Sequence, residues 1–531
     1  MKSGKKSVDS GESKIFNTEV IYSRVMCLLS IDRVKLEEVL RFELSPIPLS
    51  IFQKNGEMRP PNAKSELKEA LKVTTSQRNQ TKPEVIIVDG CAKFWDVRWP
   101  TNGTVRDLAY KMYQYVTYQL SKENSDVFLI FDRYFKYSIK GATRDQRTGN
   151  ISHNHILSLD SPLPTREIVM KSSKNKIQVI DIVSKYIIEM LTIHRFSKRF
   201  VVTCSEATPI QVENGVITTR DDLKSYHEEA DVNIIKQAMK CAEEGQSPIK
   251  VICDDTDVFV LLASYVHKYS VEALVVMESF SDARALININ QTAEKHADIM
   301  PSLIAAHALS GCDSVPKMLG IGKKKVKNAL KKGYKLESLG NINASEESIL
   351  EDSTKLIAAC YGIKLDEPDL SKARFFLWAK RTKKKLSTTL KPPKLESLPP
   401  TTEVFLLNVL RAHYQACIWN SCLDERPPEM DPTKYGWTKD DINECLLPTM
   451  FPESVFAAPD AVLQMIKCNC ASESPCSRQN CTCASAKLSC NKFCKCYESE
   501  NTCCNEWTNK DDYLNDDEEE NENEDVHELE E

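Results

Sequence analysis

The chain has 531 residues, enough for at least one large hydrophobic core and for two to four domains at roughly 150 residues per domain. Its 41% hydrophobic and 27% charged residues are ordinary for a soluble protein, and no apolar run reaches the roughly 18 residues of a membrane span. Because the first residues, MKSGKKSVDSGESK, lack the apolar core of a signal peptide, we expect an intracellular protein, nuclear or cytoplasmic and not secreted, with no membrane partner.

Charge is distributed unevenly along the chain. The last 21 residues, 511–531, hold 13 acids and no Lys or Arg, so the formal net charge of −6 becomes +7 when they are left out. We predict that residues 507–531 form a disordered acidic tail, which either solubilises the protein or competes with nucleic acid for its basic surfaces. The Lys-rich remainder suits a partner that carries phosphate.

The first clear strand is expected at Val85–Asp89, where an apolar run ends in an Asp-Gly pair. Helical periodicity follows over residues 104–120, and a second apolar strand over residues 127–132 again ends in an acid. Strand, helix and strand in this order predict a parallel sheet. Asp89 and Asp132 should therefore share one edge of that sheet.

The middle of the chain continues the alternation. We expect a helix over residues 180–193, a strand over 199–204, a hairpin around Asn214-Gly215, and a helix that opens at 227–231 and runs to about 244.

The stretch 251–262, VICDDTDVFVLL, is interpreted as a buried strand whose carboxyl end carries Asp254, Asp255 and Asp257. One more apolar strand is expected over residues 273–277. Five strands with interleaved helices predict a doubly wound α/β domain over about residues 80–300.

After the sheet, residues 303–316 are predicted to form a helix that ends in a Gly-containing turn, and a strongly basic helix follows over residues 323–332. Residues 380–385 look like a basic linker or a nuclear localisation patch, and a short helix is expected over 402–419. The expected boundaries are an N-terminal extension at 1–80, the α/β domain at 81–335, a helical extension with a basic linker at 336–400, a helical and Pro/Trp-rich connector at 401–465, a cysteine-rich domain at 466–506 and the acidic tail at 507–531.

Acids recur at strand ends and helix starts. Ligands of α/β sheets bind outside the carboxyl ends of the strands, so these acids should converge. Crowded carboxylates raise one another's pKa, and a pair of Mg²⁺ or Mn²⁺ ions, about 4 Å apart, would resolve the conflict and activate water against a phosphodiester. The other interpretation is that the acids only cap helices and turn loops. The candidate catalytic acids are Asp89, Asp132, Glu229, Asp231, Asp255, Asp257 and Asp313.

The order Val-Asp-Gly, Phe-Asp, Glu-Ala-Asp, Asp-Asp-Thr-Asp and Ser-Gly-Cys-Asp, followed by Gly-Ile-Gly, resembles the flap endonuclease group of PIN-like 5′ nucleases over about residues 85–335. The resemblance implies a PIN-like parallel sheet with flanking helices and a helix–two-turn–helix. It also implies divalent-metal-dependent hydrolysis of nucleic acid, with DNA as the expected partner. The chain departs from the family in the roughly 85 residues before its first acid and in residues 144–180, where we recognise no helical arch.

The same resemblance implies two contacts with nucleic acid. The Gly-Ile-Gly stretch stands where the family's helix–two-turn–helix binds duplex phosphates and can hold K⁺, and free N–H groups at a helix start backed by lysines suit that role. The basic stretch 136–147 stands where the family has its arch. The candidate nucleic-acid-binding residues are Lys136, Lys140, Arg144, Arg147, Gly320, Gly322, Lys323, Lys324 and Lys325.

Ten of the 20 cysteines crowd into residues 468–504. Thiolates at such short spacings suit Zn²⁺, and a segment with almost no apolar residues would take its folding energy from the metal. The spacing resembles the tesmin-type CXC domain, which implies three Zn²⁺ ions on nine cysteines and a contact with DNA. The long gap before Cys503 departs from the family and leaves Cys504 as the alternative ninth ligand. The other interpretations of the whole segment are a disulfide knot or a metallothionein-like role. The expected ligands are Cys468, Cys470, Cys476, Cys481, Cys483, Cys490, Cys494, Cys496 and Cys503.

The sequence thus predicts a metal-dependent, structure-specific nuclease joined to a zinc module that aids DNA binding. The alternative is a non-catalytic DNA-binding or chromatin-associated protein built on a degenerate nuclease fold.

Overall fold

The structure is a computed structural model. It describes residues 34–45, 47–61, 64–76, 81–141, 154–281, 285–365, 367–385 and 394–452, with shorter pieces before residue 34 and between 455 and 505. The chain divides into two compact units, one formed by Ile47–Val455 and one by Met1–Pro46 with Phe456–Glu531. In the described part of the chain, no helix has the length and apolar character that crossing a bilayer requires.

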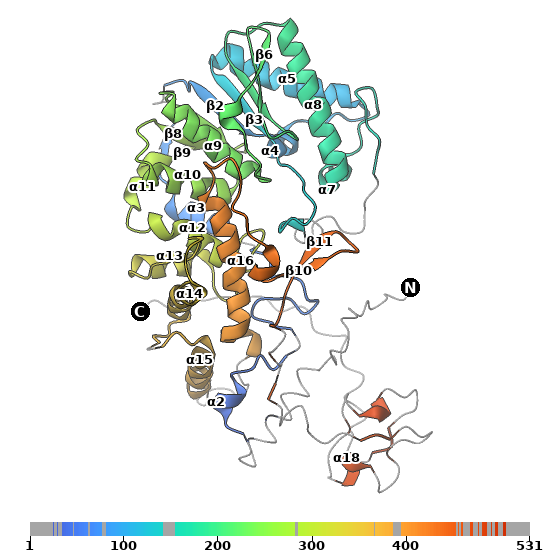
Figure 1. The fold of residues 1–531 in the computed structure, drawn as a ribbon, viewed down its shortest axis with the longest axis vertical. Helices are drawn as coiled ribbons and strands as arrows, with labels where there is room; N and C mark the ends of the chain where they lie inside the picture. The colour runs from blue at the N-terminus through green and yellow to red at the C-terminus, as the bar shows by residue number, and fades with distance from the viewer. Residues whose placement is uncertain are drawn as a thin grey trace. The chain divides into compact units, whose positions relative to one another are not determined.

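A nine-stranded sheet is the centre of the larger unit (Figure 1). Its strand order is β1-β9-β8-β7-β2-β3-β4-β5-β6. Its five middle strands run parallel and correspond to the five strands predicted from the sequence. The mixed α/β fold with a mostly parallel sheet is therefore confirmed. These strands are β2 (Val85–Asp89), β3 (Asp126–Ile130), β4 (Phe200–Thr203), β7 (Ile249–Ile252) and β8 (Val275–Glu278).

Antiparallel strands close both sides of the sheet. On one side β5 (Ile210–Glu213) and β6 (Val216–Thr219) form the predicted hairpin, and its turn residues Asn214 and Gly215 have the positive φ angles of 51° and 80° that a two-residue hairpin turn requires. On the other side β9 (Ala285–Asn288) pairs with β1 (Thr74–Ser76). A strand from the predicted N-terminal extension thus completes the sheet.

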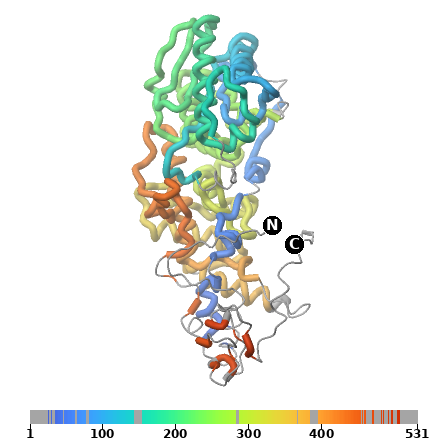
Figure 2. Tube along the Cα trace, turned by 90° about the vertical axis from the view of Figure 1, so that its right-hand side faces the viewer, coloured from blue at the N-terminus to red at the C-terminus, as the bar shows by residue number. Residues whose placement is uncertain are grey.

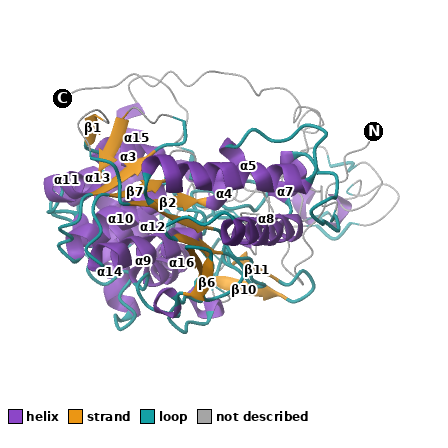
Figure 3. Cartoon of the chain, turned by 90° about the horizontal axis from the view of Figure 1, so that it is seen from above, coloured by secondary structure: helices purple, strands orange, loops and turns teal. Residues whose placement is uncertain are grey.

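Helices cover both faces, because alternate residues of each strand point to opposite sides. Ile86 and Val88 belong to one core and Val85 and Ile87 to the other. Figure 3 shows α5 and α8 side by side. Side chains of both helices belong to the first of these cores. The first core is covered by α4 (Gly90–Asp96), α5 (Val105–Tyr118) with its π-helical end Gln119–Glu123, α7 (Arg166–Lys171) and α8 (Ser173–Ile193), and the second by α9 (Ala230–Glu243), α10 (Thr256–Lys268), α11 (Ile289–Lys295) and α12 (Met300–Leu309).

The prediction of one long strand over residues 251–262 is wrong. Strand β7 ends at Ile252, and α10 starts at Thr256. Every residue from Thr256 to Val266 is buried, so the helix has the continuous apolar pattern that a buried strand also shows. The Asp255 side chain accepts a hydrogen bond from the Asp257 backbone N–H at 2.8 Å and caps the new helix.

Further helices extend the second core. Helix α16 (Thr402–Asn420) packs along α12, and α3 (Ser65–Leu71) packs against α10 and α13 (Lys323–Lys331). Figure 2 shows this early segment in blue beside the yellow-green helices. The unit also contains α14 (Glu346–Cys360), α15 (Leu370–Lys385) and a hairpin of β10 (Trp437–Asp440) and β11 (Cys445–Pro448).

Two predictions about the helices after the sheet have different outcomes. The helix predicted over 402–419 is confirmed by α16. Residues 380–385 are the end of α15 and not a linker, because Ala373 and Leu377 of the same helix are buried and hold it against the unit. Residues 386–393 lie outside the described residues.

The smaller unit contains α2 (Leu36–Val39), α18 (Thr482–Ser485) and a 3₁₀ turn at Lys495–Tyr497. One buried cluster among its described residues consists of cysteines: Cys468, Cys476, Cys481, Cys483, Cys490, Cys494 and Cys496.

The turn between β2 and α4 depends on a glycine. A Cβ on Gly90 would lie 2.4–2.8 Å from three ring atoms of Phe131. We predict that Gly90→Ala lowers the free energy of unfolding by about 1–3 kcal/mol, as overpacking does elsewhere. Thermal or urea unfolding measures the loss. The control is Gly141→Ala, since a Cβ on Gly141 has no neighbouring atom within 4 Å. Equal stability of the two variants would contradict the prediction.

Candidate metal centre

Acids from three neighbouring strands meet at the carboxyl edge of the parallel sheet. Asp89 is the last residue of β2, Asp132 follows β3 by two residues, and Asp255 follows β7 by three. Strands β7, β2 and β3 are adjacent and parallel, so their carboxyl ends lie side by side. This is the edge at which α/β sheets bind ligands.

Helices α9 and α10 add acids at their amino termini. Glu229 is the residue before α9, Asp231 lies in the first turn of α9, and Asp257 in the first turn of α10. Asp231, Asp255 and Asp257 each offer a carboxylate oxygen, and these oxygens all lie within 4.8 Å of one another. Three clustered carboxylates are the hard oxygen donors that Mg²⁺ and Mn²⁺ prefer, so the residues fit a divalent ion.

Several of these acids also hydrogen bond to backbone. Asp89 accepts a hydrogen bond from the Ala92 N–H at 2.9 Å and caps α4, and Asp132 accepts one from the Ala230 N–H at 2.9 Å. Burial, reinforced by the charges of Asp132 and Asp255, raises the pKa of Asp89 to about 7. Helix capping and the crowding of charge are therefore both real features of this site.

Crowding is also visible in the triad itself. Burial raises the pKa of Asp255 to about 6, with a further contribution from Asp257, and burial raises the pKa of Asp231 well above its ordinary range. Asp257 behaves in the opposite way, because Lys64 and His307 outweigh the effect of burial and hold its pKa well below the ordinary range.

Two lysine ammonium groups lie among the acids. Lys64 Nζ lies 3.2 Å from Asp257 Oδ2 and 2.6 Å from Asp313 Oδ1. Lys140 Nζ lies 3.1 Å from Glu229 Oε2 and 3.5 Å from Asp231 Oδ2. Burial alone would lower the pKa of both lysines, but the surrounding carboxylates raise it above the usual value. Lys140 is a candidate contact with nucleic acid, and in this structure its ammonium group contacts Glu229 and Asp231.

Two aromatic side chains from distant helices support the acids. His307 of α12 places Nε2 2.8 Å from Asp257 Oδ1, and burial lowers the pKa of His307 to about 4, so the ring is neutral at pH 7 and donates through Nε2. The His307 ring stacks on Trp419 of α16 with centroids 5.6 Å apart.

Glu229 is held on three sides. Trp419 Nε1 donates to Oε2 at 3.1 Å, Gln415 Nε2 donates to Oε1 at 3.2 Å, and Lys140 contacts Oε2. Gln415 and Trp419 are four residues apart and share one face of α16. This helix lies beyond residue 335, where the α/β domain is predicted to end from the sequence.

Four residues of this site were missed from sequence: Lys64, His307, Gln415 and Trp419. A single buried His in an apolar helix and a Gln and Trp at helical spacing are common core patterns. The 415–419 spacing on a buried face was the one available signal. The sequence holds no signal for Lys64, because it lies 25 residues before the first candidate acid and only the tertiary fold places it beside the acids.

The predicted phosphate-binding residues differ in exposure. Gly320 has a φ of +78°, Gly322 precedes α13, and Lys324 and Lys325 are exposed. Lys323 is buried, and its Nζ donates to His307 O at 2.7 Å, Ser310 Oγ at 2.9 Å and Gly311 O at 2.6 Å. These bonds keep its ammonium inside the protein, so the structure does not support a surface phosphate contact by Lys323.

The basic stretch 136–147 is described only in part. Lys136 is exposed and lies 2.7 Å from Glu444 Oε1 of the loop between β10 and β11. Arg144 and Arg147 lie outside the described residues.

The cysteine segment brings thiols together in groups of four. Cys468 Sγ lies 3.5 Å from Cys476 Sγ and 3.8 Å from Cys490 Sγ. These separations exceed the roughly 2.05 Å of a disulfide bond and approach the roughly 3.8 Å between sulfurs of a tetrahedral zinc site. Three sets have Sγ atoms within 4.8 Å: Cys468, Cys483, Cys490 and Cys494; Cys468, Cys476, Cys481 and Cys490; and Cys476, Cys490, Cys496 and Cys503.

Eight of the nine cysteines expected as ligands belong to these sets, and Cys470 is the exception. For the last ligand, the structure favours Cys503 over Cys504, because Cys503 belongs to a set of four while the Cys504 side chain is exposed.

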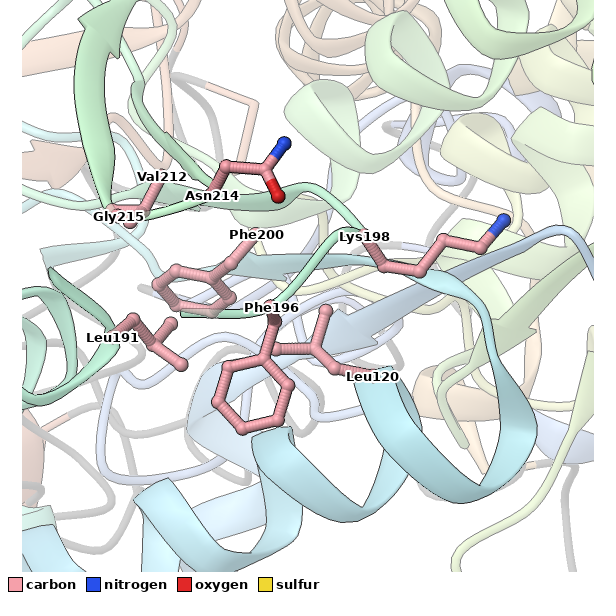
Figure 4. A pocket seen from close by; sticks show the side chains of 8 residues that line it. All are labelled: Leu120, Leu191, Phe196, Lys198, Phe200, Val212, Asn214 and Gly215. Carbon is pink, nitrogen blue, oxygen red and sulfur yellow. The ribbon is translucent and has the colours of Figure 1, made fainter. Parts of the chain in front are cut away.

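A small surface hollow lies elsewhere on the sheet (Figure 4). Apolar side chains, including Leu120, Leu191 and Phe196, line it together with Lys198 and Phe200. Phe200 is the first residue of β4, so the hollow lies near the amino end of that strand, opposite the edge that carries the acids. It contains no acid and plays no part in the candidate metal centre.

No family model and no curated protein sequence matches the chain. Among solved structures, the flap endonuclease of bacteriophage T5, in a complex with DNA and metal ions, is similar with 15% identity and a TM-score of 0.29, over 57% of this chain and 98% of that one. The catalytic core of Rad2 with a DNA substrate is similar with 11% identity and a TM-score of 0.31, over 62% and 100% of the two chains. Human GEN1 with Holliday junction DNA is similar with 12% identity and a TM-score of 0.31, over 66% and 77%. All three likenesses are distant.

The hydrogen bond from Trp419 Nε1 satisfies one oxygen of the buried Glu229 carboxylate. Trp419→Phe leaves one oxygen of a buried carboxylate without this donor, and we expect the free energy of unfolding to fall by about 1–3 kcal/mol beyond the effect of lost ring volume. The matched control is Trp437→Phe, because Trp437 is equally buried and its Nε1 has no partner among the described residues. A loss no larger for Trp419→Phe than for Trp437→Phe would show that the bond to Glu229 is unimportant for stability.

Proposed function

We propose that the protein is a divalent-metal-dependent nuclease that hydrolyses phosphodiester bonds of nucleic acid, with DNA as its expected substrate. The observation that carries the proposal is the convergence of Asp231, Asp255 and Asp257, whose oxygens lie within 4.8 Å of one another, at the carboxyl edge of a parallel sheet. A capping role alone does not explain this convergence, since Asp231 lies inside the first turn of its helix and Asp257 is fully buried.

Asp231, Asp255 and Asp257 would hold a first ion, with Asp89 and Asp132 on the neighbouring strands placed to hold a second. Bound Mg²⁺ or Mn²⁺ would supply a nucleophilic water at neutral pH and stabilise the leaving oxygen. His307 orients Asp257, and the Asp257 backbone N–H orients Asp255, because a carboxylate held by a hydrogen bond keeps a fixed direction toward the ion. Gln415 and Trp419 do the same for Glu229.

The substrate would reach this edge beside basic residues. Exposed Lys324 and Lys325 at the start of α13 would contact phosphates, with Gly320 and Gly322 allowing close approach of the backbone and the carbonyl groups there suiting K⁺. Lys136, Arg144 and Arg147 remain candidates for the same role. A nuclear location agrees with a DNA substrate and remains part of the proposal.

The cysteine segment is proposed to bind three Zn²⁺ ions and to help hold DNA, as its resemblance to the CXC domain implies. The three overlapping sets of thiols support this, because Cys490 is common to all three and Cys468 and Cys476 are each common to two. Shared thiolates let fewer cysteines complete several tetrahedral sites.

A second candidate is a DNA-binding protein without catalysis. The observation that favours it is the presence of Lys64 and Lys140 among the acids, which offsets part of their charge without metal. The two candidates make opposite predictions for metal-dependent cleavage.

Cleavage of an end-labelled 5′-flap DNA by the purified chain tests the proposal. We expect cutting with Mg²⁺ or Mn²⁺ that is lost, by at least a hundredfold, in the variant Asp255→Asn/Asp257→Asn, because two of the three clustered ligands lose their charge. Asp254→Asn is the matched control: Asp254 is adjacent in sequence but is exposed and outside the triad.

If the Asp255→Asn/Asp257→Asn variant cuts as fast as the wild type, these two acids are not needed for cleavage. DNA binding without cutting in the wild type, at any concentration of either ion, would favour the second candidate.

Zinc content tests the cysteine proposal. We expect three Zn²⁺ ions per wild-type chain by elemental mass spectrometry, and a loss of at least one in Cys490→Ser, since this thiol belongs to all three sets. Cys504→Ser is the control and should retain all three. Equal zinc loss in the two variants would contradict the assignment.

A further inference from the structure

Lys64 joins the candidate metal centre from a part of the chain that precedes the sheet. It is the residue before α3, and its Nζ contacts Asp257 at 3.2 Å and Asp313 at 2.6 Å. The Lys64 side chain is 17% exposed and the Asp257 side chain 0%. The ammonium group is thus one of the charges that offset the acids in the described chain.

The position of this ammonium conflicts with a bound ion. Asp257 Oδ1 is engaged by His307, and Asp257 Oδ2 is engaged by Lys64. An ion held by Asp231, Asp255 and Asp257 needs an oxygen of Asp257, and a divalent cation binds a carboxylate oxygen at about 2.0–2.2 Å. Two cations on the same oxygen repel each other strongly inside a buried site. The ammonium and the ion therefore compete for Asp257.

The fold allows the side chain to move while its helix stays in place. Leu67 and Leu71 of α3 are buried, and α3 packs against α10 and α13. Lys68, one turn further along, donates to the backbone oxygen of Asp254 at 2.6 Å. Helix α3 begins directly after Lys64, whose long side chain can adopt other rotamers while the helix stays packed.

We propose that Lys64 is an internal counter-ion that stabilises the metal-free acid cluster and must leave Asp257 before a divalent ion binds. This inference rests on the proposed metal-dependent function and adds a regulatory contact to it. Lys64 then has two effects of opposite sign: it stabilises the metal-free protein, and it lowers the affinity for the ion.

The test is a titration of the zinc-loaded full chain with Mn²⁺, in which the electron paramagnetic resonance signal of free Mn²⁺ measures how much of the ion is bound. Mn²⁺ prefers oxygen ligands, so the thiolates do not compete for it. We expect Lys64→Met to bind Mn²⁺ more tightly than wild type, on the order of tenfold. Lys64→Arg, which keeps the charge, should bind like wild type. Lys72→Met is the matched control, because Lys72 lies at the C-terminal end of the same helix and pairs with the exposed Glu69; it should also bind like wild type.

Thermal unfolding gives a second measurement. Without Mn²⁺, Lys64→Met should unfold at a lower temperature than wild type, and saturating Mn²⁺ should raise its midpoint by more than it raises that of wild type. Lys64→Gln replaces Lys64→Met if the latter does not fold.

The outcomes separate this inference from the proposed function. Unchanged or weaker Mn²⁺ binding by Lys64→Met, with wild type binding normally, would overturn the role of Lys64 and leave the metal site intact. If neither wild type nor any folded Lys64 variant binds Mn²⁺, the proposed metal-dependent function fails and the inference fails with it.

Discussion

The mutual repulsion of buried carboxylates is the constraint on which the rest of this site depends. Three parallel strands and two helix amino termini deliver acids to one edge of the sheet, and the pKa values of Asp89, Asp231 and Asp255 are all raised there. Nearby cations, or protons on the acids themselves, must offset the charge of such a cluster. In this structure the balancing charges are Lys64 and Lys140, and we propose that divalent ions take over part of that role.

The scaffold around the acids spans more of the chain than the α/β pattern suggests. α3, from before the sheet, anchors Lys64, and α16, from far beyond it, supplies Gln415 and Trp419 to Glu229. The sheet itself is completed by β1, which pairs with β9. Segments that look like extensions in the sequence are therefore parts of one packed unit, since α16 and α3 share its core with α10 and α12.

Sequence reasoning identified the five parallel strands and the acids at their ends, because an apolar run closed by Asp is a local pattern. It failed at residues 251–262, where a strand of four residues and a fully buried helix share one apolar run. The contacts of Lys64 and Trp419 could not be predicted, because they join residues about 190 positions apart and depend on tertiary packing alone. Lys323 illustrates the converse: a basic run suggests a surface, yet its first lysine turns inward to satisfy carbonyl groups at the end of α12.

The most direct test of this account is a crystal structure of the protein grown with Mn²⁺, with the ion located by its anomalous scattering. The account predicts an anomalous peak at coordination distance from Asp231, Asp255 and Asp257, with Lys64 Nζ displaced from Asp257 Oδ2. A fully occupied Lys64–Asp257 contact at saturating Mn²⁺, with no peak among the three acids, would contradict the central claim that this edge of the sheet is a metal centre.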